Sequence, residues 1–162
     1  MKSETEKVRT SMLEENIMTV RKAIEISNTG DTSRVVEAIS PNYFDHESQV
    51  DPVKSKLHGP EAFVDTVKLL RSAFADLHYE EQEVFATPDK VAVVTRVTGE
   101  HTGNFFVIPP SGNKIDYQAV HIFKIGDDGK IVEHKAVRDD LRLMMQLGVV
   151  GTKGLEWKGL KG

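Results

Sequence analysis

The first half of the chain carries apolar residues at helical spacing in three stretches. A helix is predicted over about residues 11–28, because apolar side chains recur there at steps of four, three and four: Leu13, Ile17, Val20 and Ile24. A shorter helix is predicted to end before Pro41, and a third helix with the same spacing is predicted from Gly59 onward. Each of these helices has one apolar face that the fold must cover.

From residue 77 onward, apolar and polar residues alternate with a period of two, which is typical of half-buried strands. Strands are predicted over four stretches separated by turn-forming residues: 77–86, 90–101, 114–125 and 131–137. Residues 105–108 are expected to continue the second strand past Gly103, and Gly126-Asp-Asp-Gly129 predicts a tight hairpin between the last two. Helices first and consecutive strands afterwards predict an α+β domain. The predicted domain is a cone, in which three N-terminal helices cover one face of a curved antiparallel sheet and enclose a pocket.

The junction between the last strand and the helix after it contains two acids. The period changes from two to helical spacing at Asp139 and Asp140, and the helix is expected to end at Gly148. One interpretation is that an Asp caps the helix by accepting hydrogen bonds from its first free amides. The other is that one carboxylate points into the pocket and acts as a general acid and base. Two adjacent acids leave room for both roles.

The composition narrows the classes of function. The chain has 162 residues and no Cys, which predicts one domain over residues 1–150, a Gly- and Lys-rich tail over residues 151–162, and no disulfide. A formal charge of -4, with basic residues scattered among acidic ones, gives no electrostatic footprint for nucleic acid or a membrane surface. The sequence shows no signal peptide and no apolar run that would span a membrane. A cytoplasmic protein with small-molecule or protein partners is expected.

Local catalytic signatures are missing from the sequence. The six His residues do not have the spacing of a locally encoded metal site, and phosphate-binding, dinucleotide-binding and serine-hydrolase motifs are absent. Neither a metal nor a cofactor is therefore expected. What remains is acid/base chemistry in an apolar pocket, for which His121 is a candidate because it shares a strand face with Tyr117 and Phe123. The alternative for His121 is a histidine satisfied in the core or at the surface.

Further residues are candidates for the pocket lining. Asp45 and His46 either orient each other at the mouth of the pocket or lie in a solvated loop. Arg96 and His101 lie on opposite faces of a regular strand, so at most one of them is expected to face the pocket. Lys135 would place a cation near the junction acids if it pointed inward, while the surface is its more usual location. The predicted pocket residues are Tyr43, His46, Phe63, Arg96, His101, Phe106, Tyr117 and Lys135.

A series of short motifs along the chain resembles a known family. In order they are Asp45-His46, Gly59-Pro60-Glu61-Ala-Phe63, Gly99-Glu-His101-Thr-Gly103, Pro109-Pro110-Ser-Gly112-Asn-Lys114, His121-Ile-Phe-Lys, Gly129-Lys-Ile-Val-Glu133-His134, Arg138-Asp139-Asp140-Leu and Gln146-Leu147-Gly148. This arrangement resembles the SnoaL-like polyketide cyclases, also called ester cyclases, over about residues 11–150. Each motif is short, and their order and spacing together are specific.

The resemblance implies a cone of the nuclear-transport-factor-like, cystatin-like class, paired as a homodimer through its sheet. It also implies ring closure of a polyketide methyl ester by intramolecular aldol condensation, without cofactor or metal. In that scheme an Asp near the end of the last strand removes a proton from the carbon between carbonyls and then protonates the new alkoxide. The matching residue here is Asp139, and Lys135 stands where the family usually has Trp. His46, His101 and His121 fall on family positions that line or border the pocket.

The sequence thus predicts a cofactor-free acid/base enzyme with Asp139 and His121 as catalytic residues. Its reaction would be aldol-type ring closure, or a related enolisation of a small apolar carbonyl compound. One alternative is a non-catalytic ligand-binding or dimerisation module of the same fold, since fold does not fix function. Another is epoxide hydrolysis or a ketosteroid-isomerase-like proton transfer, which the same cone supports by analogy. The expected partners are a small apolar or polyketide-like molecule and a second copy of the chain.

Overall fold

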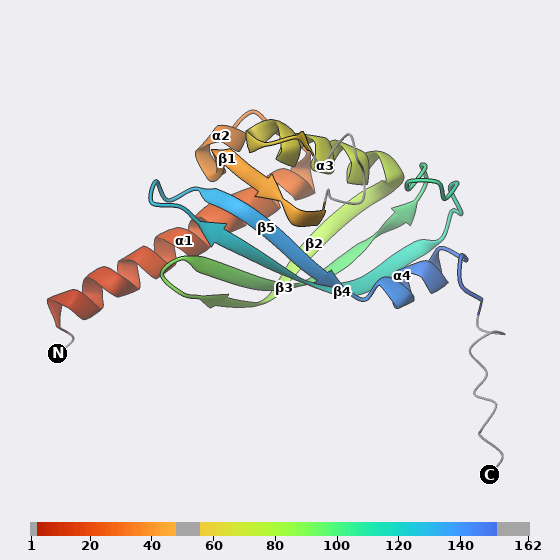
Figure 1. Cartoon of the computed structure of the whole chain (residues 1–162). Helices are drawn as coiled ribbons and strands as arrows, with labels where there is room; N and C mark the ends of the chain where they lie inside the picture. The colour runs from red at the N-terminus through yellow and green to blue at the C-terminus, as the bar shows by residue number, and fades with distance from the viewer. Residues whose placement is uncertain (1–2, 48–55, 152–162) are drawn as a thin grey trace, which may run out of the picture.

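A computed structural model of the chain describes residues 3–47 and 56–151 (Figure 1). Its helices and strands are α1 (Glu4–Thr29), α2 (Val35–Ala38), β1 (Ile39–Asp45), α3 (Gly59–Ala73), β2 (Phe74–Ala86), β3 (Lys90–His101), β4 (Lys114–Ile125), β5 (Ile131–Arg138) and α4 (Asp140–Gln146). Among these, no helix is long and apolar enough to cross a membrane. Residues 48–55 and the predicted tail beyond Gly151 lie outside the described residues.

The strands form one mixed sheet in the order β1-β5-β4-β3-β2. The last four strands pair antiparallel with their chain neighbours, as predicted, whereas β1 pairs parallel to β5 at the edge. The prediction of a wholly antiparallel sheet is therefore wrong at this edge. Pro41 lies within β1 and made the segment look like the end of a helix, but an edge strand tolerates a residue without an N–H group.

Several boundaries differ from the predictions because local signals compete there. α1 begins at Glu4, with Ser3 as its N-cap, rather than near residue 11. α2 is a single turn. The apolar spacing predicted for the third helix runs on into β2, which starts at Phe74. Residues 105–108 form an isolated bridge and do not continue β3.

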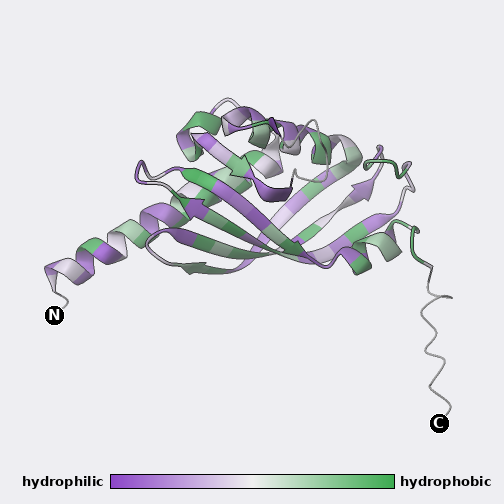
Figure 2. Ribbon diagram, viewed as in Figure 1, coloured by the Kyte–Doolittle hydropathy of each residue, from purple (hydrophilic) through white to green (hydrophobic). Residues whose placement is uncertain are grey.

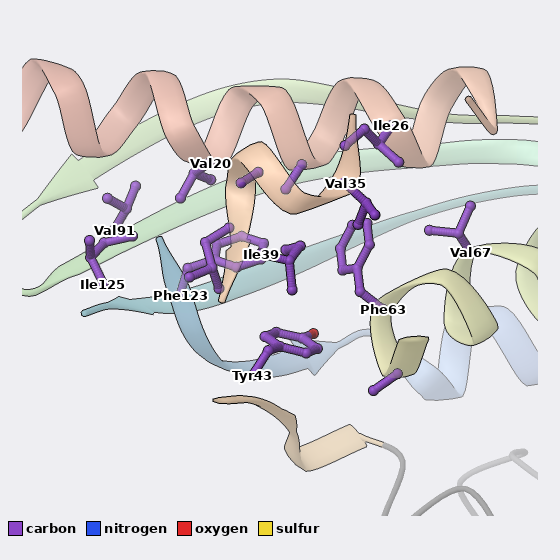
Figure 3. Packing of buried hydrophobic residues seen from close by; sticks show 14 of the residues in the cluster. Val20, Ile26, Val35, Ile39, Tyr43, Phe63, Val67, Val91, Phe123 and Ile125 are labelled. Atoms are coloured by element: carbon purple, nitrogen blue, oxygen red, sulfur yellow. The ribbon is translucent and has the colours of Figure 1, made fainter. Parts of the chain in front are cut away.

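α1, α2 and α3 lie on one side of the curved sheet, as the order of the elements predicts (Figure 1). Colouring by hydropathy shows apolar and polar residues alternating along the strands (Figure 2). The inner face of the sheet packs against the helices in a core whose side chains include Val20, Ile26, Ile39, Phe63, Val91 and Phe123 (Figure 3). A second core cluster, around Phe74, Val97, Tyr117 and Leu143, fills the other end of the same face.

Gly59 starts α3 in direct contact with β1. Its φ is +68°, and a Cβ built on it would lie 2.7 Å from the carbonyl oxygen of Pro41. Glycine meets both the left-handed backbone conformation and the close approach. The start of α3 is thereby held against β1, and Thr66, two turns into the helix, reaches the last residue of that strand, Asp45.

The helices leave the other face of the sheet open (Figure 1). Val94, Val120 and Val137 are cross-strand neighbours on this face and form an apolar row across β3, β4 and β5. Val137 is 69% exposed. The ion pairs Arg96–Asp116 and Lys124–Glu133 flank the row. We call Val94, Val120 and Val137 the valine row.

Replacing Ile39 by Ala should lower the free energy of unfolding by about 2–5 kcal/mol, because the side chain is completely buried and its removal leaves a cavity. Val36→Ala is the matched control, since Val36 lies three residues earlier and is 57% exposed. We expect that control to change stability by less than about 0.5 kcal/mol. Urea denaturation of both variants measures the difference, and equal effects would contradict this packing.

Candidate active site

A cavity of about 70 Å³ lies between α1, α3 and the inner face of the sheet. Its walls on α1 and α3 are mainly apolar, and include Ala23, Ile24, Phe63, Val67 and Leu70. Polar side chains come mainly from the strands, with one position each on α1 and α3: Ser27, Tyr43, Asp45, Thr66, Tyr79, His121 and His134. An apolar cavity with a few converging polar groups is typical of a small-molecule site.

Three of these polar side chains form a hydrogen-bonded chain. Oδ1 of Asp45 lies 3.0 Å from Nδ1 of His134, and Nε2 of His134 lies 3.0 Å from Nδ1 of His121. The chain starts on β1, crosses β5 and ends on β4. We call these three residues the Asp-His-His chain.

Strand geometry brings the three residues together. β1 is parallel to β5, with Asp45 in register with His134. On the antiparallel pair of β4 and β5, His134 lies opposite Phe123 and His121 lies opposite Ala136, so the two His residues are diagonal neighbours on the inner face. Their rings stack with centroids 5.2 Å apart and an interplanar angle of 19°.

The carboxylate of Asp45 is 2% exposed and receives several hydrogen bonds. Besides His134, the backbone N–H of Glu47 donates to Oδ1 at 3.0 Å and the hydroxyl of Thr66 donates to Oδ2 at 3.4 Å. Burial by itself would raise the pKa of Asp45, but these hydrogen bonds and the charge of His134 outweigh it and lower the pKa. Asp45 is therefore ionised at neutral pH.

His121 is held neutral by its surroundings. Burial, and then the positive charges of His134 and Arg138, lower its pKa to about 3. Its Nε2 atom is completely buried and has no hydrogen-bond partner among the described residues. A buried polar atom without a partner carries a desolvation cost, and a bound ligand that supplies a hydrogen would relieve that cost.

The hydrogen bonds fix which nitrogen atoms carry protons when both rings are neutral. A carboxylate only accepts, so His134 carries its proton on Nδ1 and presents a lone pair on Nε2. His121 must then donate from Nδ1 to that lone pair. This leaves the lone pair of His121 on Nε2, the unpaired atom.

Two tyrosines of the lining keep their protons. Burial, together with the negative charge of Asp45, raises the pKa of Tyr43 well above its usual range. Burial also raises the pKa of Tyr79. The Tyr79 ring meets His121 edge to face, with centroids 5.7 Å apart. Tyr79, a lining residue whose ring contacts His121, therefore keeps its hydroxyl proton at physiological pH.

Of the residues that the sequence predicts for the site, the structure places His121, Tyr43 and Phe63 in the lining of the cavity. Each of the three lies on a strand or helix that borders the cavity. Their grouping links segments far apart in the sequence: β1, α3 and β4.

The other predicted lining residues lie elsewhere. Arg96 is exposed, where it pairs with Asp116, and Lys135 is exposed opposite Ile122; both point away from the cavity because they alternate with inward residues on their strands. His46 pairs with Glu133 beyond the end of β1. The placement predicted for these three in the lining is wrong.

The remaining predicted residues belong to the opposite end of the sheet. His101 is completely buried, with Nδ1 accepting a hydrogen bond from the Ser111 backbone N–H at 3.2 Å. Tyr117 is buried in the second core cluster. Phe106 is 52% exposed in the loop after β3. None of them is in the lining of the cavity, because the described core fills the space between the two ends.

Asp139 is the N-cap of α4. Its carboxylate accepts a hydrogen bond from the backbone N–H of Arg142 at 3.1 Å, and the residue is exposed. The placement of Asp139 in the pocket is wrong, and the capping interpretation of the junction is the one that holds for this residue. The hydrogen bond to the helix amide turns its carboxylate away from the inner face.

Sequence reasoning missed Asp45 and His134 as members of one network. A signal was present, because His121 and His134 lie at equal distances from the predicted turn at residues 126–129, which makes them neighbours in a hairpin. The parallel pairing of β1 left no comparable signal. Asp45 therefore looked like part of a loop.

No three His, Asp or Glu side chains are arranged to hold a metal ion within residues 3–47 and 56–151. Asp45, His134 and His121 satisfy one another in a line and do not converge on one point. The arrangement is suited to moving a proton along the line.

Comparison with known proteins connects this site with a family. Residues 17–147 match the family described as SnoaL-like polyketide cyclase. The chain belongs to this family. The match includes every residue of the Asp-His-His chain.

Characterised relatives within the family carry cyclase names. The aklanonic acid methyl ester cyclase DnrD of Streptomyces peucetius is 33% identical over 135 residues, which cover 80% of this chain and 88% of that protein. The nogalonic acid methyl ester cyclase of Streptomyces nogalater is 30% identical over 122 residues, which cover 75% and 88%. The structure of TsrD from Streptomyces laurentii has the same fold, with a TM-score of 0.71, 24% identity and coverage of 82% and 97%.

The stability of the protein should depend on pH through His121. Its folded-state pKa of about 3 lies below the usual value of 6.5, so the unfolded chain binds the proton more readily between these limits. The free energy of unfolding should fall by up to about 1.4 kcal/mol for each pH unit below 6. Urea denaturation from pH 7 to pH 4 measures this, and the slope should be smaller in His121→Phe. Equal slopes would contradict burial of a neutral His121.

Proposed function

We propose that the protein is a cofactor-free acid/base enzyme that closes a ring in a carbonyl compound by an aldol-type reaction, with His121 as the general base. The observation that carries the proposal is the unpaired, buried Nε2 of His121, a residue in the lining of an apolar cavity, which is held as a lone pair by the rest of the Asp-His-His chain. Membership of a family of polyketide cyclases supports the same reaction.

The proposed reaction starts with a C–H group flanked by two carbonyls. Nε2 of His121 takes the proton, and the electrons of the C–H bond form an enolate. The enolate carbon then attacks a second carbonyl of the same molecule, which forms the C–C bond of the ring, and the resulting alkoxide takes up one proton. Such a C–H group is acidic enough for a modest base, and a positioned base contributes roughly 10²- to 10⁴-fold. Confinement of the flexible substrate in the cavity supplies much of the remaining rate enhancement.

The proposed donor to the enolate oxygen is the hydroxyl of Tyr79. It stays protonated because burial raises its pKa, and its ring contacts His121. A donor in a dry cavity stabilises the charge that develops on oxygen during the reaction. Tyr117, a predicted pocket residue, is buried in the second core cluster and is not proposed for this role.

The proposed substrate is neutral. The cavity lining contains no Lys or Arg among the described residues, and it contains the ionised Asp45, so an anion would be buried without a partner. The relatives act, by their names, on aklanonic and nogalonic acid methyl esters. The cavity of about 70 Å³ is smaller than the roughly 300–1,000 Å³ of pockets for drug-sized ligands. A methyl ester of a polyketide therefore requires the lining side chains to move apart, and a small 1,3-diketone is closer in size to the cavity.

The activity test uses His121→Gln and Asp139→Asn with three probes: aklanonic acid methyl ester, nogalonic acid methyl ester and pentane-2,4-dione. Ring closure of an ester, or enolisation of the diketone, should fall by about 10²-fold or more in His121→Gln, because amide nitrogen does not take up a proton. Asp139→Asn should keep its rate within about twofold, since Asp139 caps α4 outside the cavity. Chromatography and absorbance measure the products.

Loss of activity in Asp139→Asn with full activity in His121→Gln would contradict the assignment of the base. Circular dichroism of both variants checks that the fold is intact. Binding of a probe without turnover by the native chain would favour the ligand-binding module instead.

We also propose that two copies of the chain pair through the open face of the sheet. The valine row supplies an apolar centre, and the Arg96–Asp116 and Lys124–Glu133 pairs supply a charged rim. Val120→Glu should convert the dimer into a monomer, because it buries an unpaired charge at the centre. Gln118→Glu, two residues earlier on the same face, is the control and should stay dimeric. Light scattering after size-exclusion chromatography measures both, and a monomeric native chain would contradict the pairing.

A further inference from the structure

The Asp-His-His chain contains more titratable groups than a single general base needs. We propose that it is a proton relay in which the positive charge created by C–H cleavage resides on His134, so that Nε2 of His121 changes from acceptor to donor without His121 becoming charged. The inference rests on the proposed function, and it assigns roles to His134 and Asp45 as positioning residues.

Before the reaction, both rings are neutral. His134 donates from Nδ1 to Asp45, and His121 donates from Nδ1 to His134, at 3.0 Å in each case. Nε2 of His121 then carries the lone pair that takes the proton of the substrate. Together, the three side chains of the Asp-His-His chain carry a net charge of one negative unit, on Asp45.

After proton abstraction, one proton has been added and the hydrogen bond between the two rings has reversed. Nε2 of His121 gains the substrate proton, and Nδ1 of His121 releases its own proton to Nε2 of His134. His121 is neutral again, in its other tautomer, and His134 is an imidazolium that donates to both neighbours. The substrate has gained one negative charge and the relay has lost one, so the protons and charges balance.

The geometry favours the charge on His134 over His121. His134 lies one hydrogen bond from the carboxylate of Asp45, and this contact is buried, with the His134 side chain 12% exposed. An imidazolium at that position forms an ion pair in an apolar environment, where the attraction is strong. Among the described residues, no carboxylate forms a hydrogen bond or an ion pair with His121, whose ring is stacked against Phe123 and His134. A charge on its ring would be desolvated without a counter-ion.

Other charged and titratable groups face the relay from each neighbouring strand. Arg138 on β5 lies near His121, but it is paired with Glu47 at 3.0 Å and with Asp140 at 3.2 Å. The tyrosines around the relay, Tyr43 and Tyr79, are neutral because their pKa values are raised. The charge balance at His134 is therefore set mainly by Asp45, its direct partner.

The same nitrogen thus serves first as base and then as acid. After the new C–C bond has formed, the Nε2–H of His121 is the donor to the alkoxide, and the relay returns to its first state. No second acid is required. Because Nε2 of His121 and the carboxylate of Asp45 are shielded from solvent, the proton that leaves carbon returns to the product more readily than it exchanges with water.

Nuclear magnetic resonance of the full chain with ¹⁵N-labelled histidine tests the relay without any substrate. At pH 8 we expect His121 with a proton on Nδ1 and a free lone pair on Nε2. As the pH falls, His134 should become doubly protonated, and His121 should switch to a proton on Nε2 while staying neutral. A His121 that carries its proton on Nε2 at pH 8, or that itself becomes doubly protonated while His134 stays neutral, would overturn the relay.

Kinetics of His134→Gln test its use in catalysis. An amide side chain at this position keeps hydrogen-bonding capacity but does not hold the extra proton. We expect kcat for an ester or for pentane-2,4-dione to fall by about 10²-fold, with KM within about twofold, and the acidic limb of the pH profile to disappear. His46→Gln is the matched control, because His46 pairs with Glu133 outside the cavity, and it should leave kcat unchanged.

Failure of the relay and failure of the proposed function give different experimental results. Full kcat in His134→Gln, together with loss of activity in His121→Gln, overturns the relay and leaves the proposed function in place. The tautomer switch in a native chain that turns over none of the three probes confirms the proton transfer between the rings, but overturns its catalytic use together with the proposed function.

Discussion

The buried carboxylate of Asp45 imposes the condition that the rest of the site must meet. An ionised group that is 2% exposed is stable only if hydrogen bonds replace the water it has lost. β5 supplies His134, the chain after β1 supplies the Glu47 amide, and α3 supplies Thr66. The carboxylate thereby holds three parts of the fold at one point, and the same contacts orient His134 toward His121.

Because Asp45 must be stabilised in this way, the edge strand β1 contributes more to the site than its length suggests. β1 contributes little hydrogen bonding to the sheet, and its register with β5 shifts between Ile39 and Phe44. Its contribution lies in the side chains of Ile39, Tyr43 and Asp45, which enter the core and the cavity. The side chain of Glu47 continues the pairing beyond the strand by accepting the Ala136 N–H at 3.0 Å. The polar part of the site therefore has support at both ends of β1.

The sequence predicted the features that depend on local periodicity. Three helices before four consecutive strands, the hairpin at Gly126 and the helix after Asp139 follow from spacing and turn residues alone. It did not predict what depends on contacts distant in the sequence, namely the parallel pairing of β1 and the grouping of Asp45 with His134. His121 was found because its strand alternates clearly. Asp139 was placed wrongly because a helix cap and a catalytic acid have the same residue type, and the local pattern does not show where a side chain points.

The parallel pairing of β1 with β5 has a consequence for how the protein folds. Asp45 and His134 are 89 residues apart in the chain, whereas β2, β3, β4 and β5 form a meander of near neighbours. Contacts between near neighbours form first because they require less loop closure. β2, β3 and β4 are therefore able to pair while β1 still lacks its partner β5, the last strand to be synthesised. On a ribosome, the contact between Asp45 and His134 would form only after β5 has been synthesised.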